Sequence, residues 1–76
     1  MKKVVIYTTT FCPYCQMAKE YFAKHGVLFE EKNVELDLAA REALIQKSGQ
    51  LGVPVIDIEG KIVVGFSPEE IEKALE

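Results

Sequence analysis

The fold is decided by the stretch Lys3-Val4-Val5-Ile6-Tyr7-Thr8-Thr9-Thr10-Phe11-Cys12-Pro13-Tyr14-Cys15, in which a strand-like run meets a helix-like run. Residues 3–8 are mostly β-branched or aromatic, which predicts a largely buried strand. From Pro13 onward apolar residues recur at helical spacing, and Gly26 is well placed to end that helix. The expected apolar face of the helix consists of Tyr14, Cys15, Met17, Ala18, Tyr21 and Phe22.

Cys12 and Cys15, the two cysteines of the chain, lie where the strand gives way to the helix. Unpaired backbone N–H groups and the helix dipole favour an anion at a helix start, and Pro13 at the first helical position loses no useful donor. In such surroundings a cysteine pKa can fall from about 8.5 to roughly 3.5–7.5. The spacing therefore predicts a reversible disulfide in which Cys12 is the nucleophile and the more shielded Cys15 is the resolving thiol.

Composition excludes several other classes of protein. Seventy-six residues make one small domain, 1–76, and 49% hydrophobic with 28% charged residues is typical of a soluble globular chain. A net charge of -3 gives no general attraction to nucleic acid. The apolar run after Lys3 is too short for a signal peptide or a membrane span, so we expect a cytoplasmic protein without membrane association.

The remaining elements follow from caps and periodicity. We expect a second strand within residues 27–34, a helix over 38–48 between Asp37 and Gly49, strands over 53–58 and 61–65 joined by a Glu59-Gly60 turn, and a last helix capped by Ser67. A right-handed crossover makes the first two strands parallel, and the hairpin adds an antiparallel pair. The prediction is an α/β fold of order βαβαββα, with a four-stranded mixed sheet flanked by three helices. Cys12 would then follow the carboxyl end of the first strand, where open α/β sheets carry their sites.

The chain resembles the glutaredoxin family, with its thioredoxin-like fold. Cys12-Pro13-Tyr14-Cys15 after Ile6-Tyr7-Thr8, Val53-Pro54 before a strand and Gly65 before the last helix carry the resemblance. It implies a thiol-disulfide oxidoreductase acting on proteins or glutathione-mixed disulfides, with glutathione as a co-substrate and no bound cofactor. It also implies a cis bond before Pro54 and a Val53 backbone that pairs with an extended substrate. The expected substrate-contacting residues are Pro13, Tyr14, Val53, Pro54, Gly65, Phe66 and Ser67.

Two departures from the family pattern concern the electron source. Glutathione-using members commonly have a basic residue where this chain has Thr9, and a second glycine where it has Phe66, which is followed by Ser67 and Pro68. Gly65-Phe66-Ser67-Pro68 is more similar to small redoxins that are recharged by thioredoxin reductase and donate electrons to ribonucleotide reductase. The reductant is therefore left open between glutathione and thioredoxin reductase, and we expect a monomer.

Metal binding and other roles are less favoured for the remaining polar and aromatic residues. Zinc requires about four ligands, and the one histidine, His25, is predicted at the far end of the first helix, so no monomeric metal site is expected. A zinc-sharing or cluster-bridging dimer and a non-catalytic interaction module are the weaker functional alternatives. We expect Asp57 to reach solvent near the turn and Phe66 to act as an apolar plug.

Overall fold

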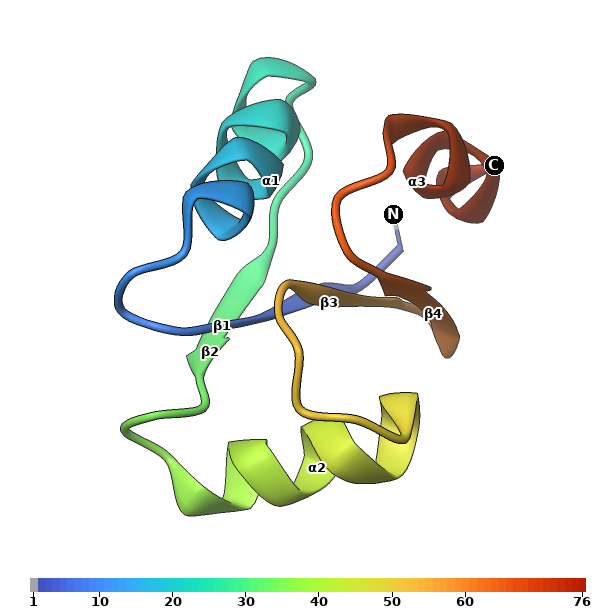
Figure 1. Ribbon diagram of the computed structural model, residues 1–76. Helices are drawn as coiled ribbons and strands as arrows, with labels where there is room; N and C mark the ends of the chain where they lie inside the picture. Colours follow the sequence, from blue (N-terminus) through green and yellow to red (C-terminus); the bar gives the residue numbers. More distant parts are fainter. Residues whose placement is uncertain (1) are drawn as a thin grey trace.

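The computed structural model describes residues 2–76, which form a four-stranded sheet with helices on both faces (Figure 1). The element order is βαβαββα, as predicted. The elements are β1 Val4–Thr8, α1 Pro13–Lys24, β2 Glu30–Asn33, α2 Leu38–Ser48, β3 Val55–Ile58, β4 Lys61–Val64 and α3 Pro68–Leu75.

The strands lie in the order β2-β1-β3-β4. β1 and β2 are parallel, with Thr8 opposite Asn33, because α1 returns the chain to the starting end of the sheet. β3 runs antiparallel to β1, with Val55 opposite Tyr7, and β4 is antiparallel to β3. The end of β1 and the segment before β3 therefore meet at the same edge of the sheet. The mixed sheet and its three helices form a thioredoxin-like fold.

Some predicted strand ends are wrong. The second strand, Glu30–Asn33, lies within the predicted range 27–34 but does not include its first residues, because the Val27 amide donates to the carbonyl of Phe22 (2.8 Å) and so still belongs to the end of α1. Lys3 precedes β1, the third strand begins after Pro54, and Gly65 follows the fourth. Gly65 has a φ of 83°, which takes it out of strand geometry.

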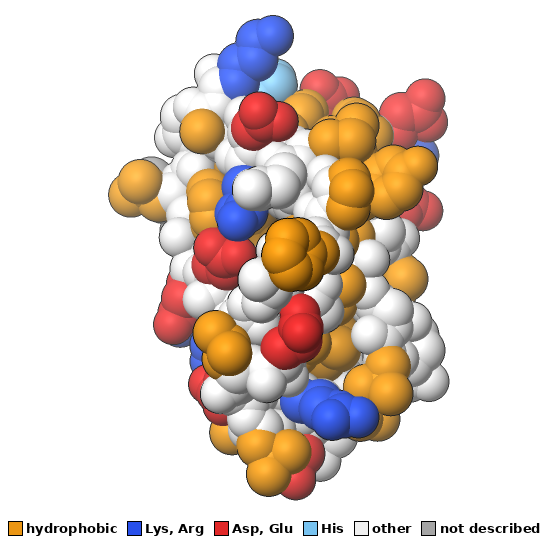
Figure 2. All heavy atoms as spheres, turned by 60° about the vertical axis from the view of Figure 1, so that its left-hand side comes forward, with side chains coloured by type: hydrophobic (Ala, Val, Ile, Leu, Met, Phe, Trp, Pro, Cys, Tyr) orange, Lys and Arg blue, Asp and Glu red, His pale blue; other side chains and the backbone are white. Residues whose placement is uncertain are grey.

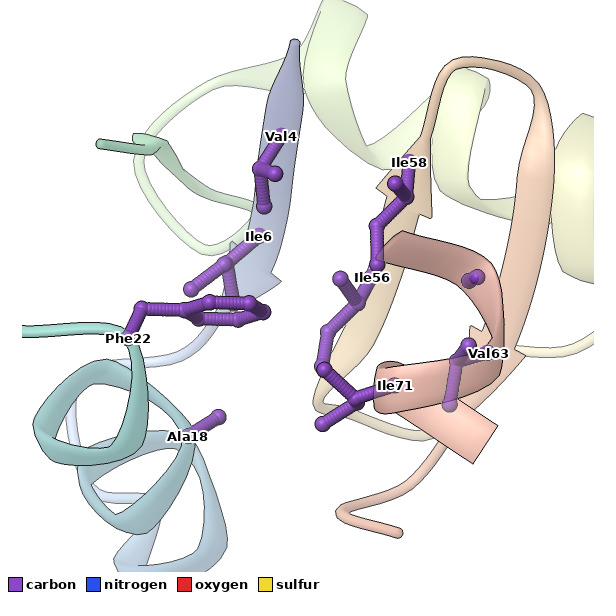
Figure 3. Close-up of a cluster of buried hydrophobic side chains, with 9 residues drawn as sticks. Val4, Ile6, Ala18, Phe22, Ile56, Ile58, Val63 and Ile71 are labelled. Carbon is purple, nitrogen blue, oxygen red and sulfur yellow. The ribbon is translucent and has the colours of Figure 1, made fainter. Parts of the chain in front are cut away.

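The core has one layer on each face of the sheet because successive strand side chains point to opposite faces. α1 and α3 cover one face and α2 covers the other (Figure 1). The layer beneath α1 and α3 is drawn in Figure 3 and contains Val4, Ile6, Ala18, Phe22, Ile56, Ile58, Val63, Ile71 and Ala74. The layer beneath α2 contains Val5, Tyr7, Val34, Ala40, Leu44 and Val55.

The predicted helix ends are confirmed. The Asp37 carboxylate accepts the N–H of Ala40 (3.1 Å) at the start of α2, and Gly49 ends that helix with a φ of 73°. The Ser67 hydroxyl accepts the N–H of Glu70 at 3.5 Å, so its cap is weaker. Within residues 2–76, no helix is both long enough and apolar enough to cross a membrane.

The two ends of the described chain lie beside each other. The ammonium group of Lys2 donates to the carbonyl oxygens of Ala74 (3.1 Å) and Glu76 at the end of α3. This contact is at the starting end of β1, whereas Cys12 lies beyond the other end of that strand.

Candidate active site

The cysteine pair occupies the first turn of α1. Cys12 is the residue before the helix, with extended backbone angles (φ -146°, ψ 96°), and its Sγ accepts the backbone N–H of Cys15 (3.1 Å). Its carbonyl oxygen accepts the N–H of Gln16 (3.1 Å), the first bond of the helical ladder. The sulfur therefore takes the place of the oxygen that usually caps a helix. The start of α1 supplies an N–H donor directly to Cys12 Sγ.

The two sulfur atoms are joined in a disulfide, with a Cα–Cα distance of 5.1 Å. Their surroundings differ, as predicted: Cys15 is only 1% exposed, whereas Cys12 is partly open to solvent. An incoming molecule can reach the sulfur of Cys12 more readily than that of Cys15. This difference gives the two thiols of the reduced form different accessibility.

Pro13 and Tyr14 form the exposed rim beside Cys12. Tyr14 is 62% exposed, so its predicted place on the apolar face of α1 is wrong. Met17 is exposed as well, and the buried stripe is the narrower set Cys15, Ala18 and Phe22. The orientation of α1 about its axis therefore leaves the Tyr14 side chain on the surface, close in sequence to Cys12.

The segment before β3 lies at the end of the sheet from which β1 leads to the cysteine pair. The Val53-Pro54 peptide bond is cis, and Pro54 is buried. The Pro54 carbonyl accepts the N–H of Gly65 (2.8 Å), which joins this segment to the one leading into α3. Because Val55 pairs with Tyr7, residues 53–54 lie at the edge of the sheet from which β1 continues to Cys12.

Phe66 and Ser67 have structural contacts of their own. Phe66 is partly buried against the core beneath α1 and α3, with its ring in edge-to-face contact with Tyr21 (6.0 Å between centroids). This agrees with the interpretation of Phe66 as an apolar plug. Ser67 caps α3. The structure thus brings Val53, Pro54 and Gly65 together and gives the other two residues packing and capping contacts.

Comparison with known proteins gives the same answer as the geometry. A family model described as Glutaredoxin matches residues 4–63. The chain belongs to the glutaredoxin family. It is therefore a thiol-disulfide oxidoreductase, with its cysteine pair at the family's active-site position.

Individual relatives cover most of the chain. A glutaredoxin-like 8.6 kDa protein of the rubredoxin operon of Clostridium pasteurianum is 44% identical over 96% of this chain and 97% of its own length. Glutaredoxin 3 of Escherichia coli K12 is 40% identical over 86% of this chain and 78% of its own. Among solved structures, buckwheat glutaredoxin in complex with glutathione has a TM-score of 0.72 and 30% identity, covering 84% of this chain and 61% of that one.

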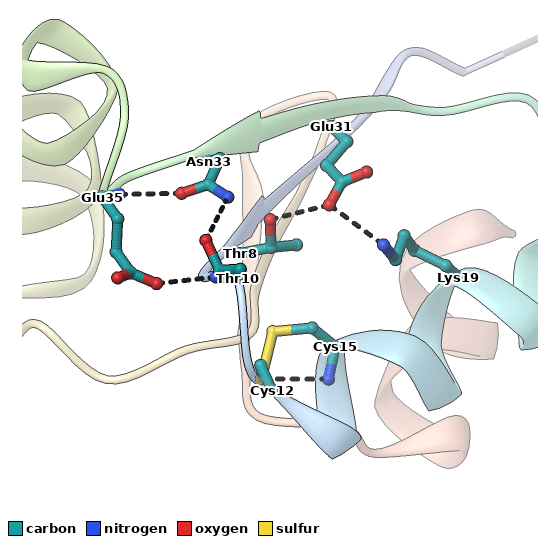
Figure 4. A network of polar contacts seen from close by, with 8 residues as sticks. All are labelled: Thr8, Thr10, Cys12, Cys15, Lys19, Glu31, Asn33 and Glu35. Atoms are coloured by element: carbon teal, nitrogen blue, oxygen red, sulfur yellow. Dashed lines mark hydrogen bonds and ion pairs between the residues drawn. A yellow bond between two sulfur atoms is a disulfide. The ribbon is translucent and has the colours of Figure 1, made fainter.

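In this glutaredoxin two polar networks border the cysteine pair (Figure 4). In the first, the hydroxyl of buried Thr8 donates to Glu31 Oε2 (2.8 Å), and Lys19 Nζ contacts the same oxygen (3.0 Å). In the second, Glu35 Oε1 accepts the backbone N–H of Thr10 (2.6 Å), and Asn33 bonds to both residues. The second network fixes the loop that carries the chain from β1 to Cys12.

Sequence reasoning did not identify Thr8, Lys19 or Glu31. One local signal was present, since Lys19 lies four residues after Cys15 and such residues are neighbours on a helix. Glu31 gave no signal because its contact with Lys19 depends on how β2 lies beside β1. Burial disfavours ionisation of Glu31, but the Thr8 hydroxyl and Lys19 outweigh burial and hold the pKa of this carboxyl below its usual value.

Asp57 lies on the opposite face of the sheet, and the expectation that it reaches solvent is wrong. Its side chain is 15% exposed, and Oδ2 contacts Lys47 Nζ (2.7 Å) while Oδ1 accepts the N–H of Gly60 (2.8 Å). Lys47 also donates to the hydroxyl of Tyr7 (2.8 Å). Burial raises the pKa of Asp57, but Lys47 and the Gly60 N–H lower it more, so the net shift is downward.

His25 is a structural residue at the end of α1, as expected. Its ring stacks on Tyr21 (4.1 Å between centroids), and Nδ1 lies 2.8 Å from the Tyr21 carbonyl oxygen. Among residues 2–76 there is no group of three or more histidine, cysteine or acidic side chains arranged to hold a metal ion.

Proposed function

We propose that this glutaredoxin reduces disulfides in proteins, and mixed disulfides of proteins with glutathione, by a dithiol route. Cys12 is the attacking thiol and Cys15 the resolving thiol. The observation that carries this assignment is the unequal burial of two sulfur atoms at one helix start, together with the N–H that Cys15 donates to Cys12 Sγ. A thiolate at position 12 would keep that donor.

The reaction transfers two electrons without a bound cofactor. Cys12 thiolate attacks one sulfur of the substrate disulfide, a Cys12–substrate bond forms, and the other substrate sulfur leaves as a thiolate that takes up a proton. Cys15 then loses its proton and attacks Cys12 Sγ. The Cys12–Cys15 disulfide forms, and the second substrate sulfur is released and protonated.

The surface around Cys12 supports polypeptide substrates. Phe11, which precedes Cys12, is 93% exposed, and Tyr14 is exposed on the other side of it. Exposed apolar side chains next to a reactive sulfur favour contact with apolar residues that flank a partner's cysteine. On the face in Figure 2, hydrophobic side chains alternate with charges of both signs, so no large field of one sign opposes a partner there.

We place glutathione as co-substrate at the Val53-Pro54 and Gly65 side of the site. The family's usual use of glutathione supports its role as co-substrate, as does the buckwheat relative crystallised with it. We propose that the Val53 backbone pairs with the extended substrate and that Pro13, Tyr14, Phe66 and Ser67 border it. Thr9 supplies no cation for a glutathione carboxylate, and Pro68 has no N–H, so glutathione binding is weak.

The second candidate is an electron donor that thioredoxin reductase recharges. The segment Gly65-Phe66-Ser67-Pro68 favours it, because a bulky ring and a proline stand where a carboxylate of glutathione would need N–H donors. Both routes end in the same Cys12–Cys15 disulfide. We further propose a single domain, a monomer and a cytoplasmic location.

One experiment separates the two electron sources. Oxidised protein is supplied with NADPH and either glutathione plus glutathione reductase or thioredoxin reductase, with a protein disulfide as the final acceptor. The dithiol glutaredoxin function predicts sustained NADPH oxidation with glutathione and glutathione reductase. NADPH oxidation with thioredoxin reductase alone would instead support the second candidate. If neither supply sustains NADPH oxidation, and chemically reduced protein also fails to reduce insulin, the oxidoreductase function is rejected.

A further inference from the structure

Lys19, one helical turn after the buried Cys15, forms an ion pair with Glu31 of β2. Lys19 Nζ and Glu31 Oε2 are 3.0 Å apart, with side chains 26% and 37% exposed. The hydroxyl group of Thr8, a fully buried residue, donates a hydrogen bond to the same Glu31 carboxylate. Glu31 therefore does not depend on Lys19 alone for its position.

The direction of helical side chains brings the charge of Lys19 toward the cysteines. Residues four apart on a helix are about 5–6 Å apart at Cβ, and long helical side chains lean toward the N-terminus. Lys19 therefore covers the turn that contains Cys15. Figure 4 shows the carboxylate of Glu31 between Thr8 and Lys19, with the disulfide apart from it at the start of the helix that carries Lys19.

We propose that Glu31 is a positioning residue that neutralises Lys19 next to the cysteine pair and thereby sets the pair's reduction potential. The inference rests on the dithiol function proposed above. An unneutralised ammonium group beside the pair would stabilise the thiolate of the reduced form, and an unneutralised carboxylate would destabilise it. The ion pair holds the two effects in balance.

The opposed charges of Lys19 and Glu31 also affect the step in which Cys15 resolves the mixed disulfide. Cys15 gives its proton to solvent before its sulfur attacks Cys12 Sγ, and the bond from Cys12 to the substrate sulfur then breaks. Lys19 lies one helical turn after Cys15, and its partner Glu31 lies across on β2. Glu35, in the adjoining loop, is bound to the Thr10 N–H, and Lys47 with Asp57 lies on the other face of the sheet.

Two single variants test the balance because they should shift the potential in opposite directions. Glu31→Gln keeps an oxygen for Thr8 but removes the charge, and Lys19→Met keeps the apolar stem. In Glu31→Gln we expect the equilibrium constant against dithiothreitol to move roughly three- to tenfold toward the reduced protein. In Lys19→Met we expect a similar shift toward the disulfide, and in the double variant a value close to the parent.

The pH dependence of alkylation is the second readout. The pH at which the thiols react half-maximally with iodoacetamide should fall in Glu31→Gln and rise in Lys19→Met. Asp57→Asn is the matched control, because it also removes one carboxylate from an ion pair but on the far face, and it should leave both readouts unchanged. Circular dichroism of each variant establishes that it is folded.

Shifts of the potential in the same direction in both single variants would overturn the inference. A charge effect must reverse when the opposite charge is removed, whereas a loss of local structure would act in the same direction in both variants. Unchanged values in folded variants would overturn it too. The dithiol function would survive either result, since it is judged by insulin reduction in the parent protein.

Discussion

At the scale of single residues, chemistry depends on two sulfur atoms that the fold treats differently. Cys12 lies before the first turn of α1, partly exposed, while Cys15 lies inside that turn and is almost fully buried. The difference arises because Cys12 precedes the helix with extended backbone angles, whereas Cys15 lies on the buried stripe of α1 with Ala18 and Phe22. The sequence predicted this difference, but it also placed on the buried stripe Tyr14, whose side chain is 62% exposed.

Replacement of either cysteine should therefore have a different result. Cys12→Ser should abolish reduction of a protein disulfide, whereas Cys15→Ser should still attack the substrate and remain joined to it. Mass spectrometry after incubation with oxidised glutathione should find the adduct at position 12 in Cys15→Ser. An adduct at position 15 in Cys12→Ser, with none in the other variant, would reverse the two roles.

Phe11 should contribute to recognition of polypeptide substrates and little to the chemistry. Phe11→Ser should lower kcat/KM for insulin about threefold to tenfold and leave reduction of a small disulfide unchanged, because only the larger partner reaches the ring. The matched control is Leu28→Ser, which alters a side chain that is 74% exposed before β2, at the end of the sheet away from Cys12. Equal losses with both substrates would contradict this role.

At the scale of elements, local signals predicted the kind and order of every helix and strand. Asp37, Gly49, Ser67 and Pro68 marked helix ends because the groups that cap a helix lie close to it in sequence. Within the predicted range 27–34, β2 begins only at Glu30, because the Val27 amide is taken by Phe22, a contact that the sequence pattern does not reveal. Likewise, the Glu31 contacts depend on strand pairing and could not be predicted from neighbours in the chain.

The two caps should differ in strength. Asp37→Ala should lower the free energy of unfolding by about 1 kcal/mol, because the N–H of Ala40 loses a charged acceptor at 3.1 Å. Ser67→Ala should cost less, since the Ser67 hydroxyl lies 3.5 Å from the N–H of Glu70. Urea denaturation at neutral pH measures both values. A larger loss for Ser67→Ala would mean that its side chain has a role beyond the cap.

At the scale of the whole molecule, the sheet separates the redox site on one face from the contacts that hold α2 on the other. One face carries α1, the cysteine pair and the Lys19–Glu31 contact. The other carries α2, which Lys47 ties to β1 through Tyr7 and to β3 through Asp57. These ties join elements far apart in the chain, so their loss should weaken the packing of α2 on the sheet and leave the redox site intact.

The stability that Asp57 provides should depend on pH. Its pKa is lowered in the folded protein, so its contribution is complete at neutral pH and is lost as the pH falls through that lowered pKa. Asp57→Asn should therefore be less stable than the parent by about 1 kcal/mol at pH 7, and the gap should narrow toward pH 3. Urea denaturation at both pH values gives the gap, and a constant gap would show that shape and not charge is responsible.

The contact of Lys2 with the last carbonyl groups of α3 has a practical consequence for anyone who engineers this chain. A fluorescent reporter attached at Lys2 or at Glu76 would lie at the end of the sheet remote from Cys12. A short linker could also join residue 76 to residue 2, because the two ends are already neighbours, and new termini could then be opened in a surface loop such as the α1–β2 connection.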